Sequence, residues 1–494
     1  MHAARYRHRA RRRGGDRALR APRRRHPHHR LGGGRVRSIE GRVSLGADLG
    51  EGVARWSELV LLGPDGEPDA TISATSYVRD SDTERPVAFL WNGGPGASSS
   101  PLHMNALGPR ILRSGEVVEN AVSLLDAADL VFVDPVGTGF SRMLRDEAKA
   151  RLLTVPGDAD AVETFVRAWL RANDREHASI HLIGESFGGY RLAAVAPQLT
   201  DLRLDSITLI SPMLDATTVA EAPENDLATV FALPTMAVAA WFHGDVCAGV
   251  DHVAEVWAEV ERFAVDEVLP ALHRGAALEP ETRIRLAARI AELVGLSPDA
   301  VLAADLRVGS EDFLRRLRAD EGLVVGRLDV RVTGPLSEPH PDGRPPAADD
   351  PALGLGRGNV IHSAPIARYL RDELRAPVDA DEPYVSLSLD LNFAWDWRPA
   401  EAMPPIFRTS VATNLGEVAT ERPDLRVLLL GGYFDLATTL ASTIHAVRHS
   451  GVPASAVEIR PLIAGHSLDE TVLVEARDAI GRTITHTSKA GTRR

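Results

Sequence analysis

A serine, an acid and a histidine each follow an apolar run in this chain. Ser186 is the central residue of Gly-Glu-Ser-Phe-Gly at 184–188, and Asp435 and His466 end two later apolar runs. A serine hydroxyl becomes a nucleophile when a histidine takes its proton and an acid orients the imidazole. The three residues therefore indicate acyl transfer through a covalent serine intermediate.

The residues around Ser186 predict a strand, a tight turn and a helix. An apolar strand pattern covers 180–183, a helical pattern covers 189–196, and glycines stand two positions on either side of the serine. Small residues at these positions let the backbone turn sharply enough to expose the hydroxyl. This arrangement is the nucleophile elbow of α/β-hydrolases, a fold in which the chain order is also serine, acid, histidine.

A glycine-rich loop follows another predicted strand. Residues 92–96 read Asn-Gly-Gly-Pro-Gly and come directly after the apolar run 87–91. Glycine lets a backbone N–H approach a reacting carbonyl closely, because it has no Cβ in the way. The loop is therefore a candidate for stabilising an oxyanion.

Four segments share the order and spacing of one enzyme family: Asn-Gly-Gly-Pro-Gly at 92–96, Asp-Pro-Val-Gly-Thr-Gly-Phe-Ser at 134–141, Gly-Glu-Ser-Phe-Gly-Gly-Tyr at 184–190 and Gly-His at 465–466. Together they resemble the serine carboxypeptidases (peptidase family S10), in their bacterial branch. The segment 233–244 is also similar to that branch. The resemblance runs from about Asp69 to about Glu470, with a divergent middle.

The resemblance implies a role for each matching residue. Ser186 would be the nucleophile, His466 the general base and then the acid, and Asp435 the residue that orients the imidazole. The oxyanion hole would use the backbone N–H groups of Gly94 and Phe187. No metal or other cofactor is needed for this chemistry, and the sequence has no Cys/His spacing typical of a metal site.

The resemblance also implies that Asn92 and Glu185 bind the free C-terminal carboxylate of a peptide, with Trp91 beside them. An ionised glutamate would repel that carboxylate, so Glu185 must carry a proton and donate it in a hydrogen bond. Burial and the approaching anion both raise the pKa of a carboxyl group. We therefore expect activity on peptides to favour acidic pH.

The sequence departs from the family around the histidine. The family usually has an aromatic residue shortly before the Gly-His pair and a Met or similar apolar residue after it. Here the neighbours are Leu462, Ile463, Ala464 and Ser467. These changes bear on local packing and substrate preference, whereas the triad is retained.

The alternation of strand and helix patterns along the chain predicts the fold class. Strand patterns near 86–91, 129–134, 179–184, 205–211, 426–431 and 456–461 alternate with helical patterns, which favours an α/β-hydrolase fold with a mostly parallel sheet and helices on both faces. Between about 214 and 380 the strand patterns stop and only helical patterns remain. The expected organisation is a disordered basic tail at 1–38, a first core half at 39–213, a helical cap at 214–380 with a mobile loop at 334–356, and a second core half at 381–494.

Charge and composition narrow the function classes. The first 38 residues hold 14 arginines against one acid, and because the whole chain carries −12, the remainder carries −25. A body this acidic would repel nucleic acid, and we expect it not to bind any. For the basic segment at 1–38, a solvated tail or a start-site artefact is favoured over an arm that binds a partner. There is no run of eighteen apolar residues, so we expect no membrane span. There is no apolar region typical of a secretory signal, so we expect a cytoplasmic location. Whether the protein forms a homodimer is left open. The single Cys247 excludes an internal disulfide.

Several alternatives stay open at this level. An esterase or lipase of the same fold would keep the triad but ignore a free carboxylate, and a non-catalytic binding protein would usually have lost a triad residue. Asp435 could cap a following helix as well as orient the histidine. Asp134 is best interpreted as an acid that supports its loop. Whether Trp395, Trp397, Arg327 and Tyr384 face the substrate cleft or pack elsewhere is not decided.

Overall fold

A computed structural model describes most of the chain. The described residues are 32–33, 36–44, 50–81, 84–244, 246, 249–337, 349–355, 358–397 and 410–491. Cys247 and the basic tail up to residue 31 lie outside them. At the end of the predicted tail, β1 (Gly32–Gly33) and β2 (Arg37–Ser44) are strands, so ordered structure begins before the expected boundary at 38.

The central sheet carries the site. Its parallel part confirms the predicted strands to within two residues and runs, in sheet order, β8 (Asp129–Asp134), β5 (Val87–Trp91), β9 (Ile180–Glu185), β10 (Leu204–Ile210), β15 (Arg426–Gly432) and β16 (Val457–Leu462). Because the strands are parallel, their carboxyl ends meet at one edge, where open α/β sheets build their sites. The α/β-hydrolase class is confirmed.

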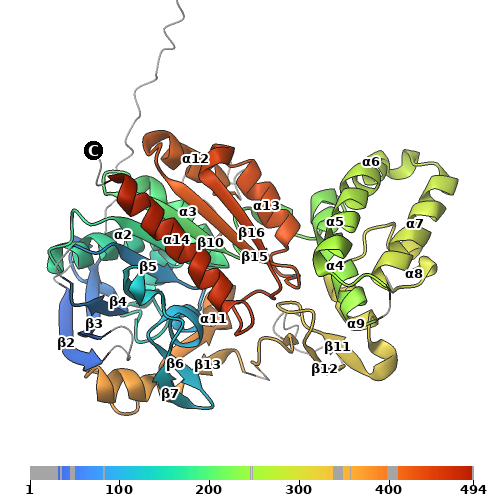
Figure 1. Ribbon diagram of the computed structural model, residues 1–494. Coiled ribbons are helices and arrows are strands. Elements are labelled where there is room, and N and C mark those ends of the chain that lie inside the picture. Colours follow the sequence, from blue (N-terminus) through green and yellow to red (C-terminus); the bar gives the residue numbers. More distant parts are fainter. Residues whose placement is uncertain are drawn as a thin grey trace, which may run out of the picture. The chain divides into compact units, whose positions relative to one another are not determined.

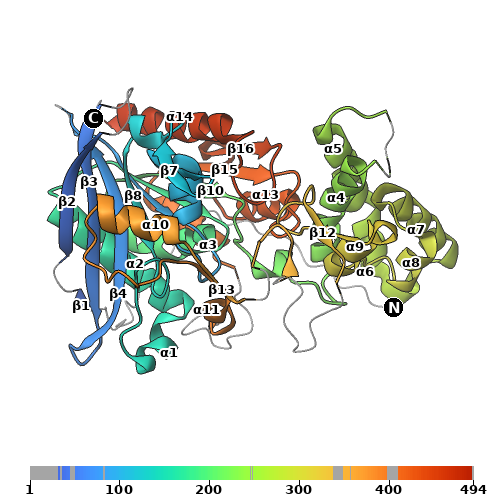
Figure 2. The ribbon, with the colours of Figure 1, turned by 90° about the horizontal axis from the view of Figure 1, so that it is seen from below.

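Antiparallel strands extend the sheet on the side of β8. β3 (Glu51–Leu62) pairs with β4 (Pro68–Arg79) across the Gly-Pro-Asp-Gly turn at 63–66, and β4 pairs with β8 (Figure 2). β1 and β2 both pair with β3. This part of the sheet contributes no side chain to the site described below.

Helices cover both faces of the sheet. On β15, Val427 and Leu429 belong to one buried cluster and Leu428 and Leu430 to another, as the alternation of a strand requires. The first cluster includes α2 (Val155–Ala172), α3 (Phe187–Val195) and α12 (Ala412–Glu421), and the second includes α14 (Leu473–Gly491), which contacts β10 and β15 (Figure 1).

The segment between β10 and β15 contains a helical bundle with its own apolar cluster. Its helices are α4 (Asp226–Phe242), α5 (Val253–Phe263), α6 (Leu269–Arg274), α7 (Pro280–Val294), α8 (Pro298–Ala303) and α9 (Ser310–Arg316). The cluster also takes in Phe434 and Leu436 of the core, which ties the bundle to the segment after β15. The domain boundaries at 214 and 380 remain predictions.

The loop predicted to be mobile at 334–356 is partly ordered. β11 (Leu323–Val325) pairs with β12 (Thr333–Pro335), and Asp350, which is buried, accepts hydrogen bonds from the backbone N–H groups of Arg327 and Leu328. Residues 338–348 lie outside the described part. Further on, β13 (Val360–His362) pairs with β14 (Val385–Ser388), and α10 (Ala364–Arg368) and α11 (Leu389–Phe393) lie nearby in the chain. No helix of the described residues is long and apolar enough to cross a membrane.

Candidate active site

The elbow places Ser186 between β9 and α3. Its backbone has φ +61° and ψ −127°, a conformation that few non-glycine residues adopt and that typically marks a functional turn. Phe187 is the first residue of α3, so its N–H has no carbonyl partner within the helix. A Cβ on Gly188 would lie 2.6 Å from the carbonyl oxygen of Trp91, which explains the glycine at this position.

The glycine-rich loop lies directly against the elbow. A Cβ on Gly93 would lie 2.6 Å from the backbone nitrogen of Phe187 and 2.7 Å from Cβ of Ser186. The next residue, Gly94, has φ +100°, a conformation that disfavours any residue with a Cβ. The structure therefore brings together the two segments that carry the predicted oxyanion donors, the N–H groups of Gly94 and Phe187.

Asp435 orients His466 from the end of β15. Nδ1 of His466 lies 2.8 Å from Oδ2 of Asp435, which is fully buried. The other carboxylate oxygen of Asp435 accepts hydrogen bonds from the N–H groups of Ala437 and Thr438, at 2.8 and 3.1 Å. The contact with His466 has the geometry that the orienting role needs, and the role stays a prediction. The cap closes a turn and not a helix, because α13 (Leu440–Arg448) begins five residues after Asp435.

Thr438 is part of this arrangement and was missed by the sequence interpretation. Its hydroxyl oxygen lies 2.8 Å from Oδ2 of Asp435, 2.8 Å from the carbonyl oxygen of Ser211 and 3.2 Å from Nδ1 of His466. The only signal in the sequence is a threonine three residues after the acid, a spacing typical of turns that an acid caps. The hydroxyl helps to fix the carboxylate that holds the imidazole.

The surroundings of His466 favour its charged form. Burial disfavours the imidazolium, but the negative charge of Asp435 and its hydrogen bond outweigh burial and raise the pKa of His466 above 6.5. No hydrogen bond joins the hydroxyl of Ser186 to His466 among the described residues. Such contacts are often long in a protein without substrate and tighten when substrate binds.

Asn92 and Glu185 form a hydrogen-bonded pair beside Ser186. Nδ2 of Asn92 donates to Oε1 of Glu185 at 2.9 Å, and the hydroxyl of Ser467 donates to the same oxygen at 3.0 Å. Oδ1 of Asn92 accepts the N–H of Leu102 at 3.0 Å, which fixes the orientation of the amide. Ser467 is one of the positions where the sequence departs from the family, and here it takes part in the site.

Glu185 is buried at the end of β9. Burial raises the pKa of its carboxyl group above 4.5, and the neighbouring imidazole of His466 and the hydrogen bonds from Ser467 and Asn92 oppose this only in part. Both hydrogen bonds end on Oε1, which leaves Oε2 to carry a proton. The geometry and the direction of the pKa shift are those that a carboxyl group needs to donate to an anion.

An ion pair behind the site links its two segments and was also missed. Nε of Arg191 lies 2.7 Å from Oδ2 of Asp158, and both side chains are buried. The guanidinium also donates to the carbonyl oxygen of Asn92 at 2.9 Å and lies 5.2 Å from the ring centre of Phe187. An arginine on a helix that is otherwise apolar could have signalled this, because a buried guanidinium needs a partner.

The tryptophans divide between core and site. Trp91 is fully buried and stacks on Phe89, with ring centres 6.0 Å apart, so its side chain belongs to the core and the substrate contact predicted for it is not supported. Trp395 and Trp397 each meet the ring of Phe187 edge-on at 5.3 Å. These two aromatic side chains therefore pack against the residue that follows the nucleophile.

Asp134 was predicted to support the loop that follows it, but its carboxylate binds the segment after the glycine-rich loop instead. Its Oδ1 accepts hydrogen bonds from the N–H and hydroxyl of Ser99, at 2.9 and 2.7 Å, and from the hydroxyl of Tyr384 at 3.1 Å. Tyr384 is buried in this contact and does not face a cleft. Burial raises the pKa of Asp134 to about 6, against the opposing effect of these hydrogen bonds.

Comparison with known proteins places residues 75–214 in the serine carboxypeptidase family. The pheromone-processing carboxypeptidase KEX1 of Colletotrichum graminicola is 32% identical over 124 residues, which are 24% of this chain and 19% of that protein. Its counterpart in Yarrowia lipolytica is 35% identical over 126 residues, 24% of this chain and 20% of that protein. This chain thus matches about a fifth of the length of these curated relatives.

A solved structure has a similar fold over most of the chain, beyond the segment that the sequence comparisons match. The prohormone-processing carboxypeptidase Kex1 from Saccharomyces cerevisiae superposes with a TM-score of 0.51 over 91% of each chain, at 13% sequence identity. At such identity the superposition is a statement about fold alone.

The predicted cytoplasmic location is wrong. The matching relatives process pheromones and prohormones, which points to a secreted or compartmental location and not to the cytoplasmic location that the sequence had suggested. The expected lack of nucleic-acid binding and the open question of a homodimer remain as they were. The resemblance itself is confirmed for residues 75–214, which match the serine carboxypeptidase family, and the chain has an α/β-hydrolase fold.

Proposed function

We propose that the protein is a serine carboxypeptidase, which removes the last residue from peptides that have a free C-terminal carboxylate. The observation that carries this proposal is the buried Asn92–Glu185 pair next to Ser186. An esterase substrate has no anion for these two groups to bind. The shared fold would not by itself separate the two activities.

The reaction follows from the positions of the polar groups. His466, held by Asp435, takes the proton of the Ser186 hydroxyl as its oxygen attacks the last peptide carbonyl. The N–H groups of Gly94 and Phe187 stabilise the oxyanion, which typically contributes a factor of about 10²–10³ per donor. His466 then gives the proton to the leaving amine, and water hydrolyses the acyl-enzyme by the reverse path.

Recognition of the carboxylate requires a proton on Glu185. With Oε1 of Glu185 already accepting from Asn92 and Ser467, the proton on Oε2 is donated to the incoming carboxylate. Catalysis at the same time requires His466 without its second proton. The ionised Glu185 raises the pKa of His466, and the imidazolium lowers that of Glu185, so the two groups titrate together.

This coupling sets the pH dependence. The active form has one proton on the pair, located on Glu185. As pH rises through the raised pKa of Glu185, that proton is lost and carboxylate binding fails; as pH falls, His466 gains a second proton and the base is lost. We expect activity on peptides to favour mildly acidic pH, because the raised pKa of Glu185 lies above 4.5.

A pair of peptides tests the proposal. One blocked peptide, prepared as the free acid and as the C-terminal amide, is incubated with the protein at pH 5 and pH 7, with Ser186→Ala as the control. Release of the last residue from the acid but not from the amide, faster at pH 5 and absent in the control, is the expected result. Cleavage of a simple aryl ester with neither peptide cut would refute the proposal in favour of an esterase.

A further inference from the structure

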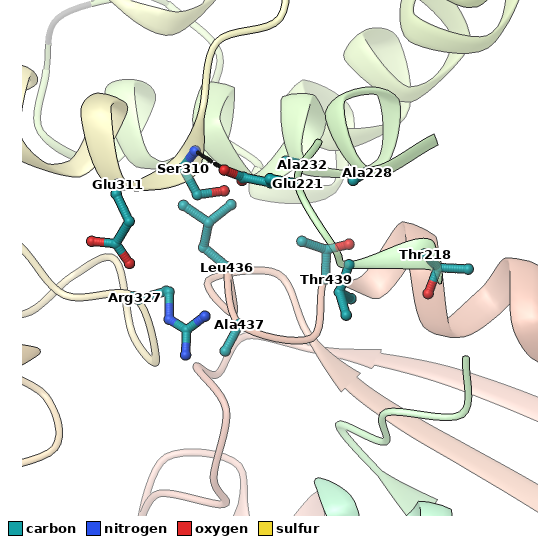
Figure 3. Close-up of a pocket in the computed structure, with 11 residues that line it drawn as sticks. Thr218, Glu221, Ala228, Ala232, Ser310, Glu311, Arg327, Leu436, Ala437 and Thr439 are labelled. Carbon is teal, nitrogen blue, oxygen red and sulfur yellow. Dashed lines mark hydrogen bonds between the residues drawn. The ribbon is translucent and has the colours of Figure 1, made fainter. Parts of the chain in front are cut away.

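A pocket of about 230 Å³ lies beside the acid turn (Figure 3). Its walls come from the segment 218–221, the first two turns of α4, the first turn of α9, and residues 436, 437 and 439, which follow Asp435 in the chain. Arg327, from the segment between β11 and β12, lines the same pocket. Nothing in the triad or in the carboxylate pair uses this space.

Arg327 is fixed by its backbone while its side chain lacks a partner. Its N–H donates to Asp350 at 3.0 Å, and its carbonyl oxygen accepts the N–H of Leu436, also at 3.0 Å. Nε is buried without a hydrogen-bond partner, and the guanidinium forms no ion pair within the described part of the chain. By contrast, Arg331, four residues later, pairs with Asp329 and Asp469. A half-buried guanidinium whose N–H donors are unused is a favourable binding group for an anion.

The carboxylates nearby do not satisfy this cation. Both oxygens of Glu221 accept the N–H of Ser310, at 2.8 and 3.1 Å, and Asp350 is used by backbone N–H groups. Glu311 lies beside Arg327 at the pocket wall (Figure 3). Burial raises the pKa of Glu311, and the charge of Arg327 opposes this only in part, so Glu311 gives up its charge more readily than an exposed glutamate.

The position of Arg327 relates the pocket to the reaction. Arg327 is close enough to His466 that its charge acts to lower the pKa of the imidazole. The C-terminal carboxylate of the substrate is assigned to Asn92 and Glu185, on the side of the glycine-rich loop. The residue before the scissile bond therefore has to extend away from that pair. The turn after Asp435 forms one wall of the pocket, and the N–H of His466 donates to the carbonyl oxygen of Leu328, next to Arg327, at 2.7 Å.

We propose that Arg327 binds an acidic side chain of the peptide at the position just before the residue that is released. The planar guanidinium forms a two-fold hydrogen-bonded pair with such a carboxylate, a geometry that discriminates against the uncharged amide of the same shape. The pocket is large enough for a glutamate side chain. This inference rests on the proposed carboxypeptidase function and names the class of peptide that it prefers.

Three blocked peptides with Glu, Gln or Lys next to the last residue test the subsite. We expect kcat/KM for the Glu peptide to exceed that for the Gln peptide by about tenfold, as for a partly solvated charged hydrogen bond. In Arg327→Gln the ratio falls to about one, whereas Arg316→Gln, which removes an exposed arginine of α9, keeps it. A ratio that is the same in the native protein and in Arg327→Gln would overturn the proposal, as would a preference for Lys.

Binding separates failure of the subsite from failure of the enzyme function. In Ser186→Ala, calorimetry should show tighter binding of the Glu peptide than of the Gln peptide, and the difference should vanish in Ser186→Ala/Arg327→Gln. If no peptide is cut by the native protein but this difference is seen, the carboxypeptidase function fails while recognition by Arg327 stands. Equal binding of the two peptides would overturn the recognition itself.

Discussion

The two sides of the site differ in how their charged groups are held. On the side of the glycine-rich loop, Arg191 is buried against Asp158 and also supports Asn92 and Phe187. On the side of the helical bundle, Arg327 lines a pocket, and its Nε has no hydrogen-bond partner among the residues that the structure describes. The comparison shows that Asn92 and Phe187, which are assigned to the chemistry, are held by contacts within the protein. Arg327, which is assigned to substrate preference, has donors that are available to a substrate.

The largest effect is expected from breaking the buried ion pair. Arg191→Met leaves the carboxylate of Asp158 buried without a partner, and we expect the free energy of unfolding to fall by about 3–5 kcal/mol. Arg167→Met, which breaks the more exposed contacts of Arg167 with Asp201 and Glu163, should cost at most about 1 kcal/mol. Denaturant unfolding measures both. Equal losses would mean that burial of the Arg191 pair carries no special weight.

A methyl group at the contact between loop and elbow should reduce catalysis. In Gly93→Ala the new Cβ meets backbone nitrogen of Phe187 at 2.6 Å, so one of the two segments has to move and the oxyanion donors separate. We expect kcat/KM to fall by a factor of about 10²–10³, the cost of losing one such donor. Gly41→Ala, where the added Cβ meets nothing within 4 Å, is the matched control. A fully active Gly93→Ala protein would argue against the proposed oxyanion hole.

The smallest effect is expected on the open side. Arg327→Gln removes a side chain that has no ion pair to lose, so the free energy of unfolding should change by less than about 0.5 kcal/mol. Chemical denaturation of this variant beside Arg191→Met makes the contrast between the two sides direct. A loss of several kcal/mol in Arg327→Gln would show that the guanidinium is a structural group, and the comparison would then fail.

Much of the frame was predictable from local patterns. Ser186 was found because an apolar strand, small residues and a helix surround it in the order that an elbow needs. Asp435 and His466 were found because they follow β15 and β16, at the same edge of the sheet, by three and four residues. The helical bundle was visible in the loss of alternating strands after β10. Its internal break was not: 251–270 reads as one helical pattern, but a π-helical segment at 264–268 separates α5 from α6.

The contacts between distant segments were not predictable. Ser467 and Arg191 join the site through partners that lie 282 and 33 residues away in the chain, and nothing in the sequence around either residue identifies its partner. The spacing of Thr438 from Asp435 was a local signal, but its contact with Ser211, 227 residues away, was not. Trp91 was misplaced for the opposite reason. It stands next to Asn92 in the sequence, but successive side chains of a strand point to opposite faces, and its indole packs in the core.

The most direct test of the central claim is the pH profile of kcat/KM for a free-acid peptide, measured for the native protein and for Glu185→Gln. The amide of glutamine donates a hydrogen bond at every pH, whereas the raised pKa of Glu185 makes the native donor vanish as pH rises. The account predicts that native activity falls on the alkaline side while the variant, whatever its absolute rate, does not show this fall. Parallel profiles would mean that a protonated Glu185 is not what recognises the carboxylate.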